Sequence, residues 1–280
     1  MPDDRAGPSP EEELALLTEA VAPAAALAHG YFRQPLKTWY KAGNSPVSEA
    51  DMAVDALLKE RLGGARPSYG WLSEETADSA ERLGTTRVIV VDPIDGTRAF
   101  IAGEPHWAVS VAIVEDGRPL VAVLSAPAQG ELYVAMRGRG ARLNGEPVTV
   151  TDVTATASAR LASPRHLVHQ AKGLKGVNPA HVARVPSLAL RLAMVAAGRF
   201  DAALASGNSA DWDLAAADLL VHEAGGRLTG LDGRTLRYNR PEPRHPSLVA
   251  ANPRLHGRLI EVLGGRRPES GRQHEARDAH

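Results

Sequence analysis

The sequence predicts an α/β sandwich of two packed subdomains, and three observations lead to this fold class. Residues 87–91 form an apolar, mostly β-branched run, as expected of a strand buried on both faces. Three further apolar runs are separated by short turns, which is the pattern of an antiparallel meander: 107–114, 119–125 and 131–136. Segments with helical apolar spacing lie before and after this block of strands.

The N-terminal part of the chain is expected to begin with two helices. Residues Glu11 to His29 show helical apolar spacing, with Pro23 as a kink or an early end. A second helix is expected to start near Ser48 and to stop at Gly63-Gly64. A short strand over residues 69–72 follows it. The strand over residues 87–91 is expected to end at Asp92.

The C-terminal part is expected to alternate helices with strands. The helices are predicted over 187–197 and 213–224, and the strands over 200–205 and 227–229. The stretch 150–186 carries no clear pattern, so the subdomain boundary is placed within it, giving an N-terminal α+β subdomain over 11–155 and a C-terminal α/β subdomain over 156–265. Residues 1–10 and 266–280 are polar and without periodicity, and are expected to be disordered.

Composition excludes several classes of protein. Aromatic residues make up only 4% of the 280 residues, so the core must consist mostly of Ala, Val, Leu and Ile. A net charge of −1 gives no support for binding to nucleic acid or acidic membranes. The chain has no cysteine, which excludes disulfides, thiolate metal sites and cysteine nucleophiles. Without a signal-peptide pattern or a long apolar run, we expect a cytoplasmic protein.

Four acidic stations stand out along the chain: Asp51, the Glu74-Glu75 pair, the Asp92/Asp95 pair and Asp213. The central pair lies in Asp92-Pro93-Ile94-Asp95-Gly96-Thr97, where a buried strand ends, Pro93 stiffens the turn and Gly96 permits a tight path. Carboxylates gathered at one point repel one another, and a hard divalent cation such as Mg²⁺ resolves that conflict. Backbone N–H groups of Gly96 and Thr97 at a helix start would suit a phosphate.

Each motif taken alone also has a purely structural interpretation. Asp-Pro and Asp-Gly are ordinary turn formers, and a Glu-Glu pair is usually solvated. The spacing of Ser48 and Asp51 is that of a helix capping box, and Asp211 and Asp213 could cap the helix that follows them. The Asp-x-Asp-x-Thr loop of haloacid-dehalogenase-type phosphatases is disfavoured, because two residues separate the aspartates here.

Taken together and in order, the motifs resemble those of a known family. They are Ser45-Pro46-Val47-Ser48 with Asp51, Leu72-Ser73-Glu74-Glu75, Val91-Asp92-Pro93-Ile94-Asp95-Gly96-Thr97, Asp211-Trp212-Asp213-Leu214-Ala215-Ala216 and Glu223-Ala224-Gly225-Gly226. The chain resembles the inositol monophosphatase-like family of Mg²⁺-dependent, Li⁺-sensitive phosphatases over roughly residues 11–262. This resemblance implies a layered sandwich of the sugar phosphatase type, in which helix and sheet layers alternate.

The resemblance also implies roles for the acidic stations. One Mg²⁺ would be held by Glu74, Asp92 and the backbone carbonyl of Ile94. A second would be held by Asp92, Asp95 and Asp213, and a third, more weakly bound ion would lie near Glu74. Glu74 and Thr97 would position the attacking water, while Asp51 polarises Thr97. Gly96 and Thr97 would hold the phosphate, with Glu75 behind the ligands. No side chain need become phosphorylated.

The family acts on several small phosphorylated metabolites: inositol monophosphates, 3′-phosphoadenosine 5′-phosphate, fructose 1,6-bisphosphate and histidinol phosphate. Local motifs look more like bacterial CysQ-type 3′(2′),5′-bisphosphate nucleotidases, and the segment Ala205-Ser206-Gly207-Asn208-Ser209 lacks the acid that true inositol monophosphatases place there. We therefore expect a bisphosphate nucleotidase, with inositol-1-monophosphatase as the alternative. Ser187 and Ser163 are the candidate substrate contacts, and Ser163-Pro164-Arg165-His166 could either meet a second phosphate or be a solvated basic loop.

A rival of another class is a catalytically inactive relative that acts as a regulatory or RNA-associated binding protein. Such a protein would be expected to lose one of the acidic stations, and all of them are present. His106 and Trp107 are assigned structural roles, because a metal-activated water makes a catalytic histidine unnecessary. The expected partner is a small phosphorylated metabolite, with neither nucleic acid nor membrane, and a homodimer is the family expectation.

Overall fold

The computed structural model describes residues 7–41, 45–164, 172–173 and 176–264. Within these residues the longer helices are α1 (Pro10–Tyr31), α2 (Glu49–Leu58), α5 (Leu188–Ala196), α6 (Asp211–Glu223) and α7 (Pro253–Gly264), and α3 (Thr97–Ile101) is a single short turn. Helix α2 continues directly into a π-helical turn over Lys59–Gly63. Short 3₁₀ turns cover Ala80–Gly84, Pro127–Gln129 and Pro179–His181.

The strands form two large sheets. The first has seven strands in chain order: β3 (Gly70–Ser73), β4 (Arg87–Asp95), β5 (Ala108–Glu115), β6 (Arg118–Ala126), β7 (Glu131–Met136), β8 (Ala141–Leu143) and β9 (Glu146–Val148). Strand β3 pairs parallel to β4, and every later pair is antiparallel, so the predicted meander is confirmed and extended by β8 and β9.

The second sheet has five strands in the spatial order β11 (Val182–Arg184), β10 (Leu161–Ser163), β12 (Ala202–Ala205), β16 (Leu248–Ala251) and β14 (Arg227–Gly230). Two small antiparallel pairs complete the strands: β1 (Thr38–Tyr40) with β2 (Pro46–Ser48), and β13 (Ser209–Ala210) with β15 (Arg244–His245). Sheet membership therefore changes between β9 and β10, across a stretch that carries no clear pattern in the sequence.

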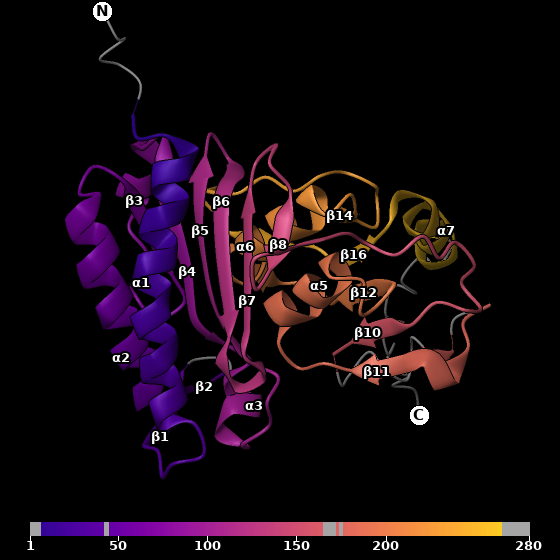
Figure 1. Ribbon diagram of the computed structural model, residues 1–280, viewed down its shortest axis with the longest axis horizontal. Helices are drawn as coiled ribbons and strands as arrows, with labels where there is room; N and C mark the ends of the chain where they lie inside the picture. Colours follow the sequence, from indigo (N-terminus) through magenta and orange to yellow (C-terminus); the bar gives the residue numbers. More distant parts are fainter. Residues whose placement is uncertain (1–6, 42–44, 165–171, 174–175, 265–280) are drawn as a thin grey trace, which may run out of the picture.

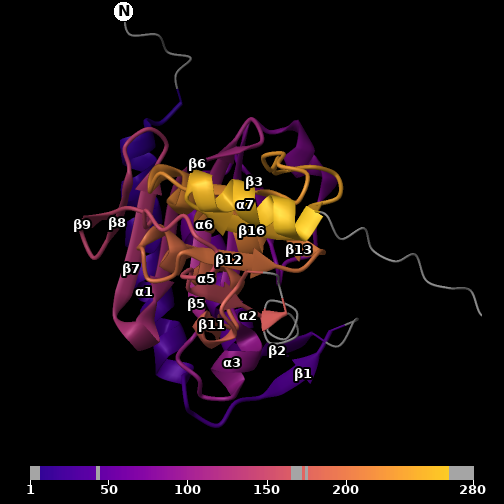
Figure 2. The same cartoon turned by 90° about the vertical axis from the view of Figure 1, so that its right-hand side faces the viewer.

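Helices and sheets alternate in five layers, which confirms the predicted fold class. Figures 1 and 2 show α1 and α2 on the outer face of the first sheet, α5 and α6 between the two sheets, and α7 on the far face of the second. Three apolar clusters fill the spaces between these layers. The middle cluster is shared by both sheets, so α5 and α6 join the two halves of the chain.

Alternation along each strand explains the layering. On β4, Ile89 and Val91 pack toward α1 and α2, whereas Val88 and Val90 pack into the middle layer. Both sets are buried, as the apolar run predicted. The middle layer is rich in alanine, including Ala215, Ala216 and Ala217 on α6. Such small side chains let α6 approach the sheet closely, and this approach sets the position of its N-terminus.

Helix boundaries follow local capping, with corrections to the prediction. Helix α1 begins at Pro10, one residue early, because Ser9 and Glu12 form a capping box. Pro23 lies inside α1 and does not end it, since burial of neighbours such as Val21 and Ala24 offsets the cost of an interior proline.

Three further boundaries also differ from the prediction. The helical path after α2 runs through Gly63-Gly64 to Ala65. Helix α6 begins at Asp211, two residues before the predicted start. Strand β4 reaches Asp95, beyond the predicted end at Asp92, by way of a break in register. The predicted tail lies outside the described residues, as does most of the predicted N-terminal lead-in, and the division into two subdomains stays a prediction.

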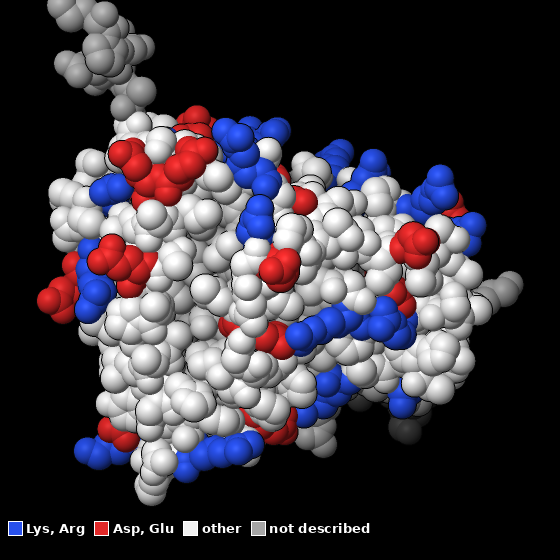
Figure 3. Space-filling view, in the orientation of Figure 1, with Lys and Arg blue, Asp and Glu red and all other residues white. Residues whose placement is uncertain are grey.

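Charges of both signs are interspersed over the face shown in Figure 3, in keeping with the net charge of −1. One buried charge on α1 is paired with two arginines. The Glu13 side chain on α1 is fully buried and meets Arg66 at 3.1 Å and Arg87 at 3.3 Å. Among the described residues no helix is long and apolar enough to cross a membrane.

The C-terminal end of α6 generates a pH-dependent stability prediction. His222 Nδ1 lies 2.8 Å from Asp218 Oδ1. Burial alone would lower the pKa of His222, but the hydrogen bonds and charge of Asp218 outweigh it and raise the pKa to about 9. This stabilisation is complete below the unfolded pKa of about 6.5 and is lost as the pH rises through about 9.

We therefore expect His222→Gln to lower the free energy of unfolding by about 1 kcal/mol at pH 6 and by almost nothing at pH 10. Urea denaturation at pH 6, 8 and 10 measures this. The matched control is His29→Gln, an exposed histidine in the last turn of α1. A difference between wild type and His222→Gln that stays constant with pH would contradict the assignment.

Candidate active site

The central acidic pair lies at the carboxyl end of β4, where the strand leaves regular pairing. Asp92 still pairs with Ser110 and Asp95 with Ala108, but the register shifts between them. This irregularity lets both carboxylates point to the same side, although two residues separate them. Asp92 and Asp95 are almost fully buried, with exposed fractions of 1% and 7%.

Gly96 turns the chain from β4 into α3 in a conformation that disfavours other residues. Its φ is +95°, in the left-handed region. A Cβ here would also lie 3.0 Å from the backbone carbonyl of His106 and 3.1 Å from Cβ of Ser187. Positive φ and close neighbours together require glycine. Thr97 then begins α3, so the predicted turn from strand into helix is confirmed.

Asp213 completes a cluster of three carboxylates. It lies in the first turn of α6 and accepts a hydrogen bond from the backbone N–H of Ala210 at 2.7 Å. One carboxylate oxygen from each of Asp92, Asp95 and Asp213 lies within 4.8 Å of the others. Segments more than 100 residues apart in the sequence thus meet at one point, as the acidic stations predicted.

Burial and mutual repulsion disturb the ionisation of this cluster. Burial raises the pKa values of Asp92 and Asp213 well above the usual range, and the neighbouring carboxylates raise them further. Burial also raises the pKa of Asp95, against hydrogen bonds from Ser187 and from the backbone N–H of Ala189, the latter at 2.6 Å. The cluster therefore needs positive charge.

Asp92 shows most directly what kind of charge fits. Its Oδ1 accepts a hydrogen bond from the backbone N–H of Ile94 at 3.0 Å, whereas its Oδ2 is buried without a partner among the described residues. An unsatisfied buried carboxylate oxygen is costly unless it binds a proton or a cation. Three oxygen donors from separate carboxylates match the preferences of a hard divalent metal ion.

Thr97 and Asp51 form a second, connected part of the site. The Thr97 hydroxyl lies 3.0 Å from Oδ1 of Asp51 and 3.0 Å from the carbonyl oxygen of Ile94. Oδ2 of Asp51 accepts hydrogen bonds from the backbone N–H and the hydroxyl of Ser48, at 2.8 and 2.6 Å. Asp51 therefore caps α2 and contacts Thr97 at once, so the capping interpretation is confirmed, and the catalytic role of Asp51 stays a prediction.

The two side chains of the Glu74-Glu75 pair lie in different surroundings. Glu74 lines the cavity beside the cluster, whereas the Glu75 side chain is 3% exposed. Lys41 Nζ bridges them, 3.2 Å from Glu74 and 2.8 Å from Glu75. Burial raises the pKa of Glu75 to about 7 despite Lys41. Glu75 thus lies behind Glu74, as expected, whereas the contact of Lys41 with both glutamates was not predicted.

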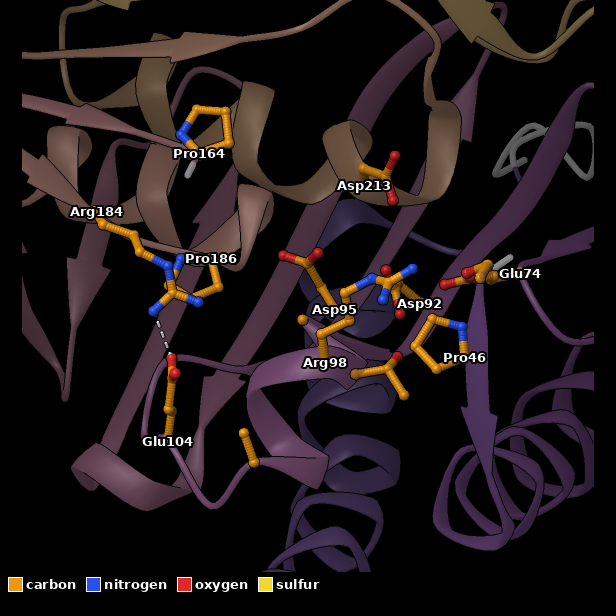
Figure 4. A pocket seen from close by; sticks show the side chains of 14 residues that line it. Pro46, Glu74, Asp92, Asp95, Arg98, Glu104, Pro164, Arg184, Pro186 and Asp213 are labelled. Atoms are coloured by element: carbon orange, nitrogen blue, oxygen red, sulfur yellow. Dashed lines mark hydrogen bonds and ion pairs between the residues drawn. The ribbon is translucent and has the colours of Figure 1, made fainter. Parts of the chain in front are cut away.

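A cavity of about 550 Å³ opens over the cluster. Figure 4 shows Glu74 and Pro46 at one end, the three aspartates near the middle, and Arg184 with Glu104 at the other end. Gly96, Thr97 and Arg98 also line it. Its size is that of ordinary small-molecule sites. Neither Arg184 nor Glu104 was predicted from the sequence, because single charged residues without a motif are usually solvated.

The two predicted substrate contacts are placed differently. Ser187 is fully buried at the N-terminal end of α5, where its hydroxyl hydrogen-bonds Asp95 and accepts from the N–H of Leu190. Ser163 is also fully buried on β10, and it is the next residue, Pro164, that lines the cavity. Both serines as substrate contacts stay predictions. Arg165 and His166 lie outside the described residues.

Two further side chains support the site from behind. Arg191 on α5 is 2% exposed, and its Nη1 donates to the carbonyl of Val185 at 2.6 Å. Burial lowers its pKa to about 10, against the attraction of Asp95 and Asp213. Trp107 packs edge-on against Phe100 with ring centroids 4.8 Å apart, which agrees with the structural role assigned to it.

Comparisons with known proteins agree with this geometry. A model of the inositol monophosphatase family matches residues 9–266. A histidinol-phosphatase of Mycobacterium tuberculosis is 39% identical over 78% of this chain and 85% of its own length. An inositol-1-monophosphatase of Rhizobium meliloti is 40% identical over 71% and 77%. The crystal structure of extragenic suppressor protein suhB from Bartonella henselae superposes with a TM-score of 0.79 at 28% identity, covering 90% and 98%.

The repulsion within the cluster predicts an unusual stability effect. We expect Asp92→Asn to raise the melting temperature in EDTA by a few degrees, because it removes one buried charge from three. Added Mg²⁺ should raise the melting temperature of the wild type but much less that of the variant, since only a bound ligand stabilises the folded state. Thermal denaturation in EDTA and in about 10 mM Mg²⁺ measures both effects.

The matched control is Asp116→Asn, in the turn between β5 and β6, where φ is +51° and asparagine is well tolerated. That control should respond to Mg²⁺ as the wild type does. An Asp92→Asn protein that gains as much from Mg²⁺ as the wild type would contradict the proposed cation site.

Proposed function

Because the chain belongs to the inositol monophosphatase family and is therefore a metal-dependent phosphoric monoester hydrolase, we propose that it uses Mg²⁺ to remove one phosphate from a small phosphorylated metabolite. Water is consumed, and an alcohol and inorganic phosphate are released. One observation carries the proposal: three buried carboxylates converge within 4.8 Å, and Oδ2 of Asp92 has no partner among the described residues.

The proposed ligands form two sets that share Asp92. Glu74, Asp92 and the carbonyl of Ile94 would hold one ion, and Asp92, Asp95 and Asp213 a second. Mg²⁺ fits these sets because every donor is an oxygen. When bound, the ions neutralise phosphate oxygens and lower the pKa of a bound water.

The chain's own residues orient the reaction. The Thr97 hydroxyl has one proton, and donating it to Asp51, 3.0 Å away, leaves its lone pairs available to accept a hydrogen bond from the attacking water. Glu74 borders the same cavity and accepts the other proton of that water. Gly96 and Thr97 begin α3, so their backbone N–H groups hold the phosphate.

For the substrate we propose a nucleoside 3′(2′),5′-bisphosphate such as 3′-phosphoadenosine 5′-phosphate. Among the described residues that line the cavity, Glu104 is the one carboxylate outside the proposed ligand set, and Arg184 neutralises it. Nothing there offers an unpaired acid to a cationic leaving group, and residues 205–209 supply no acid for sugar hydroxyls. An anionic group of the substrate could instead take the place of Glu104 beside Arg184.

Inositol 1-phosphate is the second candidate, because a relative of that name is 40% identical. A third, histidinol phosphate, is suggested by the name of another relative at 39% identity. Its leaving alcohol carries an amine and an imidazole, which the neutralised end of the cavity suits less well. These candidates differ only in the leaving group, since the phosphate end of the cavity is common to all of them.

The first test addresses the metal. We expect Asp95→Asn to lower kcat/KM by at least about 100-fold, because removal of a charged ligand costs several kcal/mol of transition-state stabilisation. EDTA should abolish phosphate release by the wild type, and added Mg²⁺ should restore it. Asp116→Asn serves again as the control and should keep full activity. Hydrolysis that continues undiminished after chelation would rule out the mechanism.

The second test addresses the substrate. Phosphate release is compared for 3′-phosphoadenosine 5′-phosphate, inositol 1-phosphate, fructose 1,6-bisphosphate and histidinol phosphate under identical conditions. We expect the nucleotide to have the highest kcat/KM, by about 10-fold or more, since one charge-assisted contact accounts for such a factor. A clear preference for inositol 1-phosphate or histidinol phosphate would overturn the substrate proposal and leave the metal-dependent hydrolysis in place.

A further inference from the structure

An ion pair closes the end of the cavity that faces away from Glu74. Nη1 of Arg184, the last residue of β11, lies 2.7 Å from Oε2 of Glu104, which follows α3. Figure 4 shows this pair across the cavity from Glu74, with Asp95 between them. Both side chains line the cavity, and neither belongs to the proposed metal ligands.

The pair contributes little to folding. The two side chains remain 39% and 37% exposed, and an ion pair of that exposure contributes about 0–1 kcal/mol. Among the described residues, the hydrogen bond to Glu104 uses only Nη1 of Arg184. The other N–H donors of the guanidinium can therefore bind a ligand. An exchange of Glu104 for a ligand anion would therefore cost the fold almost nothing.

The position of the pair defines the ligand that it suits. The aspartate cluster and Gly96-Thr97 bind the phosphate to be cleaved, and Arg184 lies beyond them in the same cavity. A phosphate on the leaving group would reach the guanidinium and could engage two of its N–H groups, the geometry that arginine provides and lysine does not. A neutral leaving group would leave the Arg184–Glu104 pair undisturbed.

We propose that Arg184 is a specificity-determining residue that binds the second phosphate of a small bisphosphate, and that Glu104 holds its side chain until the substrate displaces it. This inference rests on the proposed function, because it assigns the non-reacting end of the same cavity. It also separates two roles: the carboxylate cluster performs the hydrolysis, and Arg184 selects the leaving group.

The experiment compares two substrates that differ only in the second phosphate: 3′-phosphoadenosine 5′-phosphate, which is the bisphosphate, and adenosine 3′-monophosphate. The wild type should prefer the bisphosphate in kcat/KM by about 10-fold or more, in line with one charge-assisted contact. Arg184→Met should remove most of this preference, and the loss should appear as a higher KM for the bisphosphate more than as a lower kcat. Arg184→Lys should keep part of the preference, since it keeps the charge but loses the fork.

Glu104→Gln is an independent variant, for which we expect the KM for the bisphosphate to change in the opposite direction. It frees Arg184 from its competitor, so the KM for the bisphosphate should fall by about 2- to 5-fold, the scale of a weak exposed ion pair. The matched control is Arg234→Met, which removes a surface arginine that pairs with Asp232 and does not line the cavity. Melting temperatures should show that all variants are folded.

The outcomes separate this inference from the proposed function. A wild type that hydrolyses both nucleotides equally well, or an Arg184→Met variant that keeps the full preference, would overturn the role of Arg184 while leaving the hydrolase intact. A wild type that releases no phosphate from any phosphomonoester in Mg²⁺ would overturn the proposed function, and the inference with it.

Discussion

The structure depends on one electrostatic constraint: three carboxylates, from Asp92, Asp95 and Asp213, are buried within 4.8 Å of one another. In a folded protein without compensation this arrangement is strongly unfavourable. The surrounding elements are arranged to offset it. The N-terminal ends of α5 and α6 lie at the cluster: the backbone N–H of Ala189 binds Asp95, and Asp213 belongs to the first turn of α6. The partial positive charge of each helix start favours the carboxylates. Oδ2 of Asp92 still has no partner among the described residues. A metal ion that binds this oxygen would gain free energy by satisfying it.

This arrangement is held in place by packing far from the chemistry. Asp213 reaches the cluster only because α6 lies close against the first sheet, and the alanines of the middle layer permit that approach. Asp95 is fixed by the start of α5 through Ser187 and Ala189. The second sheet and α7 hold these helices from the other side (Figure 1). The layered sandwich is therefore the means by which distant carboxylates are forced together.

In the proposed function, the cavity has a reacting end at the carboxylate cluster and a recognition end at Arg184, and these two ends differ in burial. The reacting end is buried, and almost any substitution there leaves a charge or a polar group unsatisfied. The recognition end is half-exposed, and its Arg184–Glu104 pair contributes little to stability. Relatives with similar sequences carry names with different substrates, histidinol phosphate and inositol 1-phosphate. A rigid reacting end beside a replaceable recognition end accounts physically for such diversity.

Local patterns in the chain were enough to predict the fold class, the strand that carries Asp92 and Asp95, the turn at Gly96, the cap at Ser48 and Asp51, and the four acidic stations. These features can be predicted from the sequence because strand burial, turn geometry and capping depend on neighbours within a few residues. Three contacts of the site depend instead on how the layers pack: the Ser187 hydroxyl with Asp95, Lys41 with Glu74 and Glu75, and Arg184 with Glu104, 80 residues apart in the chain. A lone charged or hydroxyl side chain carries no periodicity, so its partner is fixed only when the layers pack.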